Sequence, residues 1–82
     1  MNVIKKILME QGRTQSWLIR ELSNKYSIDV PRSTMSNYCA NRYQPDIITF
    51  KLISEVLDVM METLIPNIVP NKVESEDILL TK

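Results

Sequence analysis

The sequence predicts a compact, all-α domain of five short helices followed by a short C-terminal tail. Two observations predict this fold class. Apolar residues recur at intervals of three and four along most of residues 3–65, which is typical of amphipathic helices. Residues that start or stop helices bound each of these runs. The chain has 82 residues, 44% apolar and 24% charged, which is enough for one core and too apolar for a disordered protein.

The first two predicted helices lie before residue 27. Residues 3–11 form the first helix, in which Ile4, Ile7, Leu8 and Gln11 lie on one stripe. Asn2 is a candidate N-cap for this helix, and Gly12 is its stop signal. Thr14 caps the second helix, residues 15–25. The apolar face of that helix consists of Leu18, Ile19 and Leu22.

The third predicted helix differs from the others because it is polar. Residues 27–31 lack helical periodicity, and the ring of Pro31 presets φ for the first position of the helix that follows. That helix covers residues 32–40, and its few large apolar side chains are Met35, Tyr38 and Cys39. A helix without a wide apolar face keeps much of its surface free for a polar partner.

The fourth predicted helix carries the strongest core signal. Asn41 can adopt the left-handed conformation that ends the third helix, and Pro45 prevents helical continuation. Asp46 then caps the fourth helix. Its core face is formed by Ile47, Phe50, Ile53 and Leu57. A short fifth helix over residues 60–65 is stopped by a following proline.

The charges divide the chain into two halves. We assign residues 1–65 to the helical domain and residues 66–82 to an acidic tail that is a candidate dimerisation or partner segment. The net charge of the whole chain is zero. Through Pro45 there are seven basic and three acidic residues, whereas from Asp46 onward there are three basic and seven acidic ones. A polyanion would therefore meet the N-terminal half, unless these charges are only solvated helix faces.

The inventory of side chains excludes most enzyme classes. There is no His, which excludes zinc-protease helices, Cys/His zinc fingers and nucleophiles paired with His. One Cys cannot form an intramolecular disulfide, and one Gly cannot build a phosphate-binding loop. We therefore expect no enzyme, no cofactor and no metal. Because no signal peptide and no apolar run of about 20 residues is present, we expect a cytoplasmic protein without membrane contact.

Four segments in succession resemble the helix-turn-helix domain of phage repressor and Cro proteins, the XRE-type family. Gly12-Arg13-Thr14-Gln15 resembles the Gly-x-Thr-Gln motif that begins the second helix of the family. Residues 30–38 resemble its recognition helix, and residues 41–45 resemble its Gly-Arg-x-x-Pro turn. Residues 47–65 resemble its last two helices, with Asp58 where the family has a glycine. The resemblance implies a compact lambda-repressor-like domain over residues 3–65.

This resemblance implies a sequence-specific DNA-binding transcriptional regulator, of the repressor kind, that lays its third helix in the major groove of double-stranded DNA. Gln15 and Arg42 fall at the family's phosphate-contact positions. The positions from which the family reads base edges hold Arg32, Ser33, Ser36 and Asn37. Arg can pair with guanine and Asn with adenine. The alternative is that these side chains are an exposed polar helix face, and that Gln15 merely begins a helix.

An insertion separates the two helices of the motif. Seven residues lie between Leu22 and Val30, where the family has about one, so the turn is longer by roughly six residues. Either the second helix continues, or a loop anchored by Tyr26 and Ile28 bulges out. The sequence leaves open whether this insertion touches DNA.

Three further positions differ from the family or leave a choice. The family often pairs a Glu with an Arg where this chain has Cys39 and Leu8, so we predict an apolar contact between these two and place Cys39 in the core. Asn41 replaces a glycine, which a left-handed turn tolerates. Trp17 is expected at the edge of the core, either against Tyr26 or at a partner surface.

Two assemblies are predicted from the C-terminal part of the chain. A homodimer would present two recognition helices to a pseudo-palindromic operator, and its candidate surface is Met60, Met61, Leu64, Ile65 and residues 78–80. The alternative is that these side chains close the monomer core. A second function, of another class, is an antitoxin-like module whose acidic tail folds on a basic protein partner. The sequence specifies neither the operator, the sign of regulation, nor any inducer.

Overall fold

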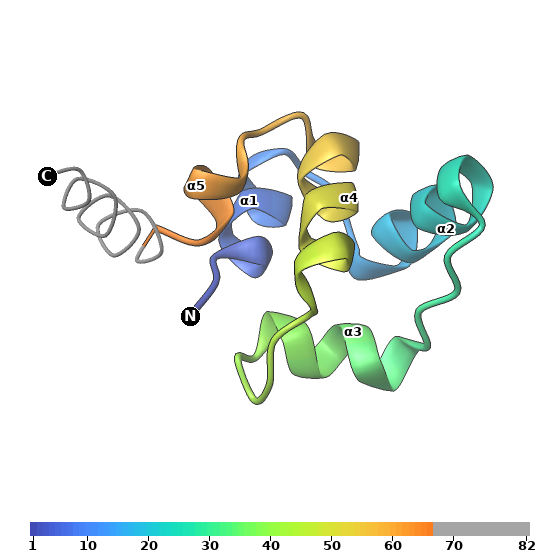
Figure 1. Ribbon diagram of the computed structural model, residues 1–82, viewed down its shortest axis with the longest axis horizontal. Helices are drawn as coiled ribbons and strands as arrows, with labels where there is room; N and C mark the ends of the chain where they lie inside the picture. Colours follow the sequence, from blue (N-terminus) through green and yellow to red (C-terminus); the bar gives the residue numbers. More distant parts are fainter. Residues whose placement is uncertain (67–82) are drawn as a thin grey trace, which may run out of the picture.

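The computed structural model describes residues 1–66, and this part of the chain consists of five α-helices and connecting turns without a β-strand (Figure 1). In order they are α1 (Ile4–Glu10), α2 (Gln15–Tyr26), α3 (Arg32–Cys39), α4 (Ile47–Leu57) and α5 (Met61–Leu64). The predicted all-helical, five-helix fold is confirmed. The predicted tail and the partner segment within it fall on residues 67–82, outside the described residues.

Helix α4 lies between the other helices (Figure 1). It packs against α2 on one side and α5 on the other, while α3 packs against α2 and α1. Helix α3 lies across one end of this arrangement. The backbone N–H of Val3 donates to the carbonyl of Leu64 at 3.0 Å, which joins the start of the chain to α5.

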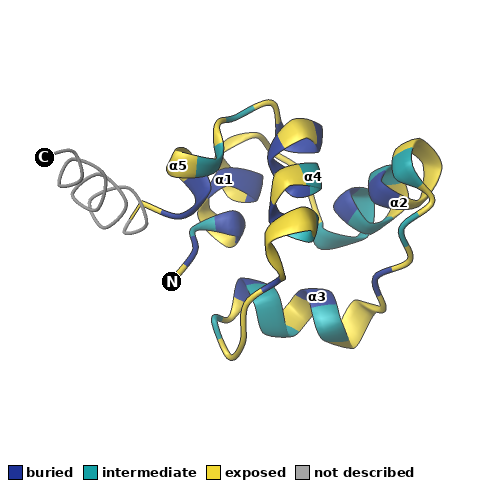
Figure 2. Cartoon of the chain, in the orientation of Figure 1, coloured by how far each residue is buried: buried dark blue, intermediate teal, exposed yellow. Residues whose placement is uncertain are grey.

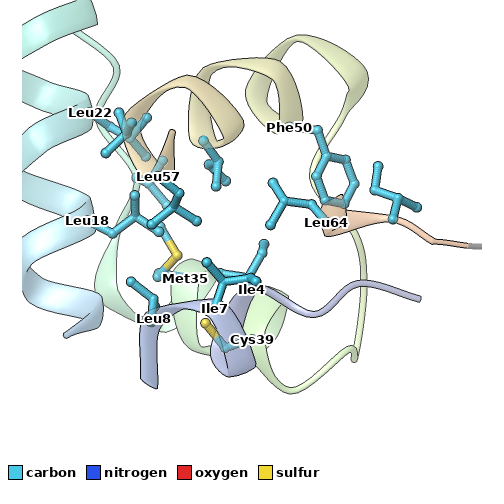
Figure 3. Close-up of a cluster of buried hydrophobic side chains, with 14 residues drawn as sticks. Ile4, Ile7, Leu8, Leu18, Leu22, Met35, Cys39, Phe50, Leu57 and Leu64 are labelled. Atoms are coloured by element: carbon cyan, nitrogen blue, oxygen red, sulfur yellow. The ribbon is translucent and has the colours of Figure 1, made fainter. Parts of the chain in front are cut away.

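The core lies between the helices, and each of the five contributes to it (Figures 2 and 3). Its fully buried side chains are Ile4, Leu18, Leu22, Met35, Ile53, Leu57 and Leu64. Leu8 and Cys39 are both buried in this cluster, so the assignment of Cys39 to the core is confirmed. Burial also raises the pKa of the Cys39 thiol, which disfavours the reactive thiolate.

Thr14, Asp46 and Asn41 cap or end helices as predicted. The Thr14 hydroxyl accepts a hydrogen bond from the backbone N–H of Trp17 at 3.0 Å, and a carboxylate oxygen of Asp46 accepts one from Thr49 at 2.9 Å. Asn41 has φ of +60°, the left-handed conformation predicted for it. Asp58 also has φ of +60°, at the position where the similar family has a glycine.

Two residues predicted to begin helices stand one position away from their predicted role, although α3 begins at Arg32 as expected. Val3, and not Asn2, occupies the N-cap position of α1, although the Asn2 side chain still accepts from the N–H of Ile4 at 3.0 Å. Pro31 is the N-cap of α3 and not its first helical residue. Its φ of −62° suits a helix, but its ψ of 154° is extended.

The prediction that Ile47 faces the core is wrong, because its exposed fraction is 61%. Ile47 is the first residue of α4, whereas the buried face of that helix begins at Phe50. Helical spacing identifies a face, but it does not tell where along the helix the neighbouring helices begin to cover it. Gln11, also on a predicted stripe, is exposed, and its side-chain amide donates to the carbonyl of Leu57 at 2.8 Å.

Both alternatives for the insertion occur together. Helix α2 continues to Tyr26, and Ser27, with φ of +57°, ends it in the left-handed conformation. Tyr26 and Ile28 then pack against the core and anchor the loop. The Tyr26 hydroxyl also donates to a carboxylate oxygen of Glu55 at 2.9 Å, and this hydrogen bond raises the pKa of Tyr26.

Trp17 lies at the edge of the core, as predicted, but its neighbour there is Arg13, whose guanidinium carbon lies 4.1 Å from the ring centroid. At the other end of the described chain, Leu64 and Ile65 are buried and help to close the monomer core, whereas Met60 is exposed. None of the helices in residues 1–66 is long and apolar enough to cross a membrane.

Candidate nucleic-acid interface

Helices α2 and α3 form the candidate interface, and α3 is two-sided. Met35 and Cys39 are buried on the side that meets the core, whereas Ser33 and Ser36 are exposed on the other side (Figure 2). The Arg32 guanidinium donates from Nη2 to the Ser16 hydroxyl at 2.9 Å. This contact joins the first residue of α3 to the first turn of α2.

Four of the six predicted site residues lie in two places, and the other two, Ser33 and Ser36, are exposed on α3 between them in the sequence. Arg32 is exposed and lies by the start of α2, where Gln15, the first residue of that helix, is half-buried. Asn37 is half-buried near the end of α3, and Arg42 is exposed in the turn that follows. The helix geometry leaves the backbone N–H of Gln15 without an intrahelical acceptor. The structure therefore brings Arg32 near the start of α2, and Asn37 together with Arg42.

Asn37, Arg42 and Tyr43 form a hydrogen-bonded cluster at the end of α3. Arg42 donates from Nη1 to the Asn37 side-chain oxygen at 2.9 Å, and its backbone N–H donates to the Asn37 carbonyl at 3.0 Å. The Asn37 side-chain nitrogen donates to the Tyr43 hydroxyl at 3.3 Å. The Tyr43 ring meets Tyr38 edge-to-face, with centroids 5.8 Å apart. The Asn37 amide is thus held in one orientation before any ligand is present.

The arginines near α3 differ from most of the described lysines. Lys6, Lys25 and Lys51 each face a carboxylate four residues away on the same helix, at 3.9, 3.6 and 3.5 Å. Within residues 1–66, Arg20, Arg32 and Arg42 lie within ion-pair distance of no carboxylate. Their positive charge is available to an anionic ligand.

An open pocket adjoins the start of α3 on the α2 side. Its lining consists of Ser16, Ile19, Arg20, Ser23, Asn24, Asp29 and Arg32, and its volume is about 330 Å³. Two arginines and one carboxylate, Asp29, therefore face the same depression. The insertion contributes Ser23 and Asp29 to it, so the longer turn borders the candidate interface.

Sequence reasoning missed two polar side chains that hold this surface in place. Ser16 holds Arg32, from which it is 16 residues distant in sequence. Asn2 bonds to the turn after α3, with partners 36 to 42 residues away. Patterns that repeat every three or four residues carry no information about such distant contacts. Within residues 1–66 no group of His, Cys, Asp or Glu is arranged to hold a metal ion.

One solved structure supports a relation to a known protein. The chain is similar to the crystal structure of a putative DNA-binding protein from Bacteroides fragilis, with 30% sequence identity and a TM-score of 0.67. The match covers 78% of this chain and 94% of that one. No protein-family model matches the sequence, and neither does a curated protein.

Proposed function

The chain belongs to the same family as the Bacteroides fragilis protein, and on that premise we propose that it binds double-stranded DNA. More narrowly, we propose a transcriptional regulator of the phage repressor and Cro type, cytoplasmic and without catalytic activity. The observation that carries the proposal is the polar, exposed side of α3 beside the first turn of α2, with arginines at both ends of α3.

In this proposal α3 enters the major groove, and the start of α2 faces the backbone. Arg32 and Asn37 read base edges, each pairing being worth about 1–3 kcal/mol of discrimination. Ser33 and Ser36 make less specific contacts on the same side of α3. Gln15 and Arg42 bind phosphates, and the free N–H group at the start of α2 assists Gln15.

The cluster around Asn37 has a consequence for this mechanism. In the free protein the Asn37 oxygen accepts from Arg42, so an adenine amino group competes with Arg42 for that oxygen or shares it. A phosphate is a stronger partner for a guanidinium than a neutral amide is. Binding of Arg42 to the backbone would therefore release Asn37 for base readout, and the two contacts would form together.

We further propose that the regulator acts as a homodimer, because two copies related by a two-fold axis would place two α3 helices about 34–36 Å apart on a pseudo-palindromic site. Occupancy of a promoter is then enough for repression. Of the described residues of the predicted dimer surface, Met60 is exposed and Met61 is half-buried, whereas Leu64 and Ile65 are buried within the monomer.

The test is fluorescence anisotropy with a duplex from upstream of the gene and a scrambled duplex, titrated at several salt concentrations. We expect tighter binding to the native duplex and weaker binding as salt rises. Arg32→Ala and Asn37→Ala should each reduce the preference between the duplexes. Arg42→Ala should weaken binding to both duplexes and lower the salt slope by about 1.

Lys51→Ala is the matched control, because this exposed lysine on α4 is paired with Glu55 and lies outside the proposed interface. It should bind as the wild type does. Equal, weak binding to both duplexes would exclude this promoter as the operator, and absence of binding at low salt would refute the proposed function.

A further inference from the structure

Asn2 is a buried polar residue, and both polar atoms of its side chain make hydrogen bonds. Its exposed fraction is 4%. The side-chain nitrogen donates to the carbonyl of Tyr38 at 3.0 Å and to the side-chain oxygen of Gln44 at 2.6 Å. The side-chain oxygen accepts from the N–H of Ile4 at 3.0 Å. Buried polar groups need such partners, and the two partners of the Asn2 nitrogen lie in the last turn of α3 and in the turn after it.

The backbone of Asn2 takes part in the same network. Its N–H donates to the Asn41 side-chain oxygen at 2.8 Å, and its carbonyl accepts from the Asn41 side-chain nitrogen at 3.1 Å. Gln44 donates to the same Asn41 oxygen at 3.1 Å. Three amide side chains, those of Asn2, Asn41 and Gln44, therefore form one closed cluster, which we call the amide clamp.

The amide clamp holds both ends of the short turn over residues 41–45. Asn41 begins this turn in the left-handed conformation, and Gln44 lies near its end. Between them are Arg42 and Tyr43, both exposed. Asn2 also donates to the Tyr38 carbonyl in the last turn of α3, which accepts a second hydrogen bond from the backbone N–H of Asn41 at 3.1 Å. The clamp thus links the N-terminus to the segment that presents Arg42.

We propose that Asn2 is a positioning residue for nucleic-acid binding, acting through the amide clamp on the turn that carries Arg42 and Tyr43. The inference rests on the proposed function. A short turn that is ordered before binding does not lose its backbone freedom on the ligand, so the affinity is higher. The clamp orders the backbone of this turn, whereas the Arg42 side chain exchanges its contact with Asn37 for the ligand.

Asn2→Asp is the sharpest variant, because it keeps the size of the side chain and the acceptor for Ile4. It replaces the donor nitrogen with a carboxylate oxygen that faces two acceptors, the Tyr38 carbonyl and the Gln44 side chain. We expect DNA affinity at least about 3- to 10-fold weaker for native and scrambled duplexes alike, because two hydrogen bonds of the clamp are lost and the new carboxylate repels DNA. The neutral variant Gln44→Ala separates the two causes: it should weaken binding without any change of charge, and in the Arg42→Ala background it should have no further effect.

Gln11→Ala is the matched control for a merely structural role. Gln11 is also an amide that bonds a distant backbone carbonyl, that of Leu57, but it does not touch the turn. It should lower thermal stability while leaving affinity within about twofold of the wild type. If Asn2→Asp does not fold, Gln44→Ala removes one side of the clamp from an exposed position and should also weaken binding.

A second measurement tests whether the backbone of the turn is ordered in the free protein. Backbone ¹⁵N order parameters at residues 42 and 43 should fall towards flexible values in Gln44→Ala and stay rigid in Gln11→Ala. Folded clamp variants that bind DNA as the wild type does would overturn the positioning role. Failure of the wild type to bind any duplex would instead refute the proposed function, and with it any role of the clamp in binding, whatever the order parameters show.

Discussion

Helices α3 and α4 follow one another in the chain but are held in place by different interactions. Helix α4 buries Phe50, Ile53, Val56 and Leu57 and begins with a capping carboxylate. Helix α3 buries only Met35 and Cys39 and has no side-chain cap. Polar contacts at its two ends take the place of a wide apolar face: Arg32 with Ser16 at one end, and Asn2 with the Tyr38 carbonyl at the other.

This difference shows how a small domain can present a polar helix. Burial of apolar area provides most of the stabilising free energy, and α4 supplies much of it. Helix α3 then needs only two anchoring side chains and polar contacts at its ends, which leave the exposed side free. The helix proposed to read DNA therefore buries fewer apolar side chains than the helix that follows it.

The largest loss of stability is expected from shortening a core side chain of α4. Ile53 is fully buried, so Ile53→Ala should reduce the free energy of unfolding by about 2–5 kcal/mol, measured by urea denaturation. Ile47→Ala, the same change on the same helix at a side chain with an exposed fraction of 61%, should stay within about 0.5 kcal/mol of the wild type. Similar losses in the two variants would contradict the assignment of the α4 core face.

A smaller loss of stability is expected from removing the N-cap of α2. Thr14→Ala removes the acceptor for the Trp17 N–H and should cost about 1 kcal/mol of unfolding free energy. Ser23→Ala changes an exposed position within the same helix and is the control. Because α2 carries both Gln15 and Ser16, the Thr14 variant should also bind DNA more weakly, and a variant of unchanged stability would refute the capping role.

The contact between Arg13 and Trp17 should contribute less. Arg13→Ala removes a cation from the ring face and is expected to cost about 0.5–1 kcal/mol, as at other exposed sites. The fluorescence of Trp17, the single tryptophan, should change with it and report the lost contact. Arg20→Ala is the control, and an identical spectrum in both variants would contradict the contact.

The smallest effect on stability concerns the Asp46 cap of α4, and it appears only at low pH. Hydrogen bonds from Thr49 lower the pKa of Asp46, so its capping contribution is present above the carboxyl's unfolded pKa and is lost as the pH falls through the folded pKa. Asp46→Asn keeps a capping oxygen but does not titrate. The stability difference between wild type and variant should therefore change below about pH 4, and a constant difference down to pH 2 would contradict this account.

The sequence by itself determined the local features of this protein. The five helices, the caps Thr14 and Asp46, and the left-handed Asn41 follow from interactions between residues at most a few positions apart. Such interactions depend on residue type and spacing, which a sequence displays directly. The resemblance to a DNA-binding family followed from the same kind of local motif.

Only the tertiary structure decided which of these residues are in contact. It leaves Ile47 exposed and places Arg32 beside Ser16. It also pairs Asn37 with Arg42, and it brings Asn2 into contact with Asn41, 39 residues away. These outcomes depend on how far each helix extends over its neighbours and on which ends lie together. Packing of the whole core sets those relations, because the free energy of burial depends on area and not on sequence separation.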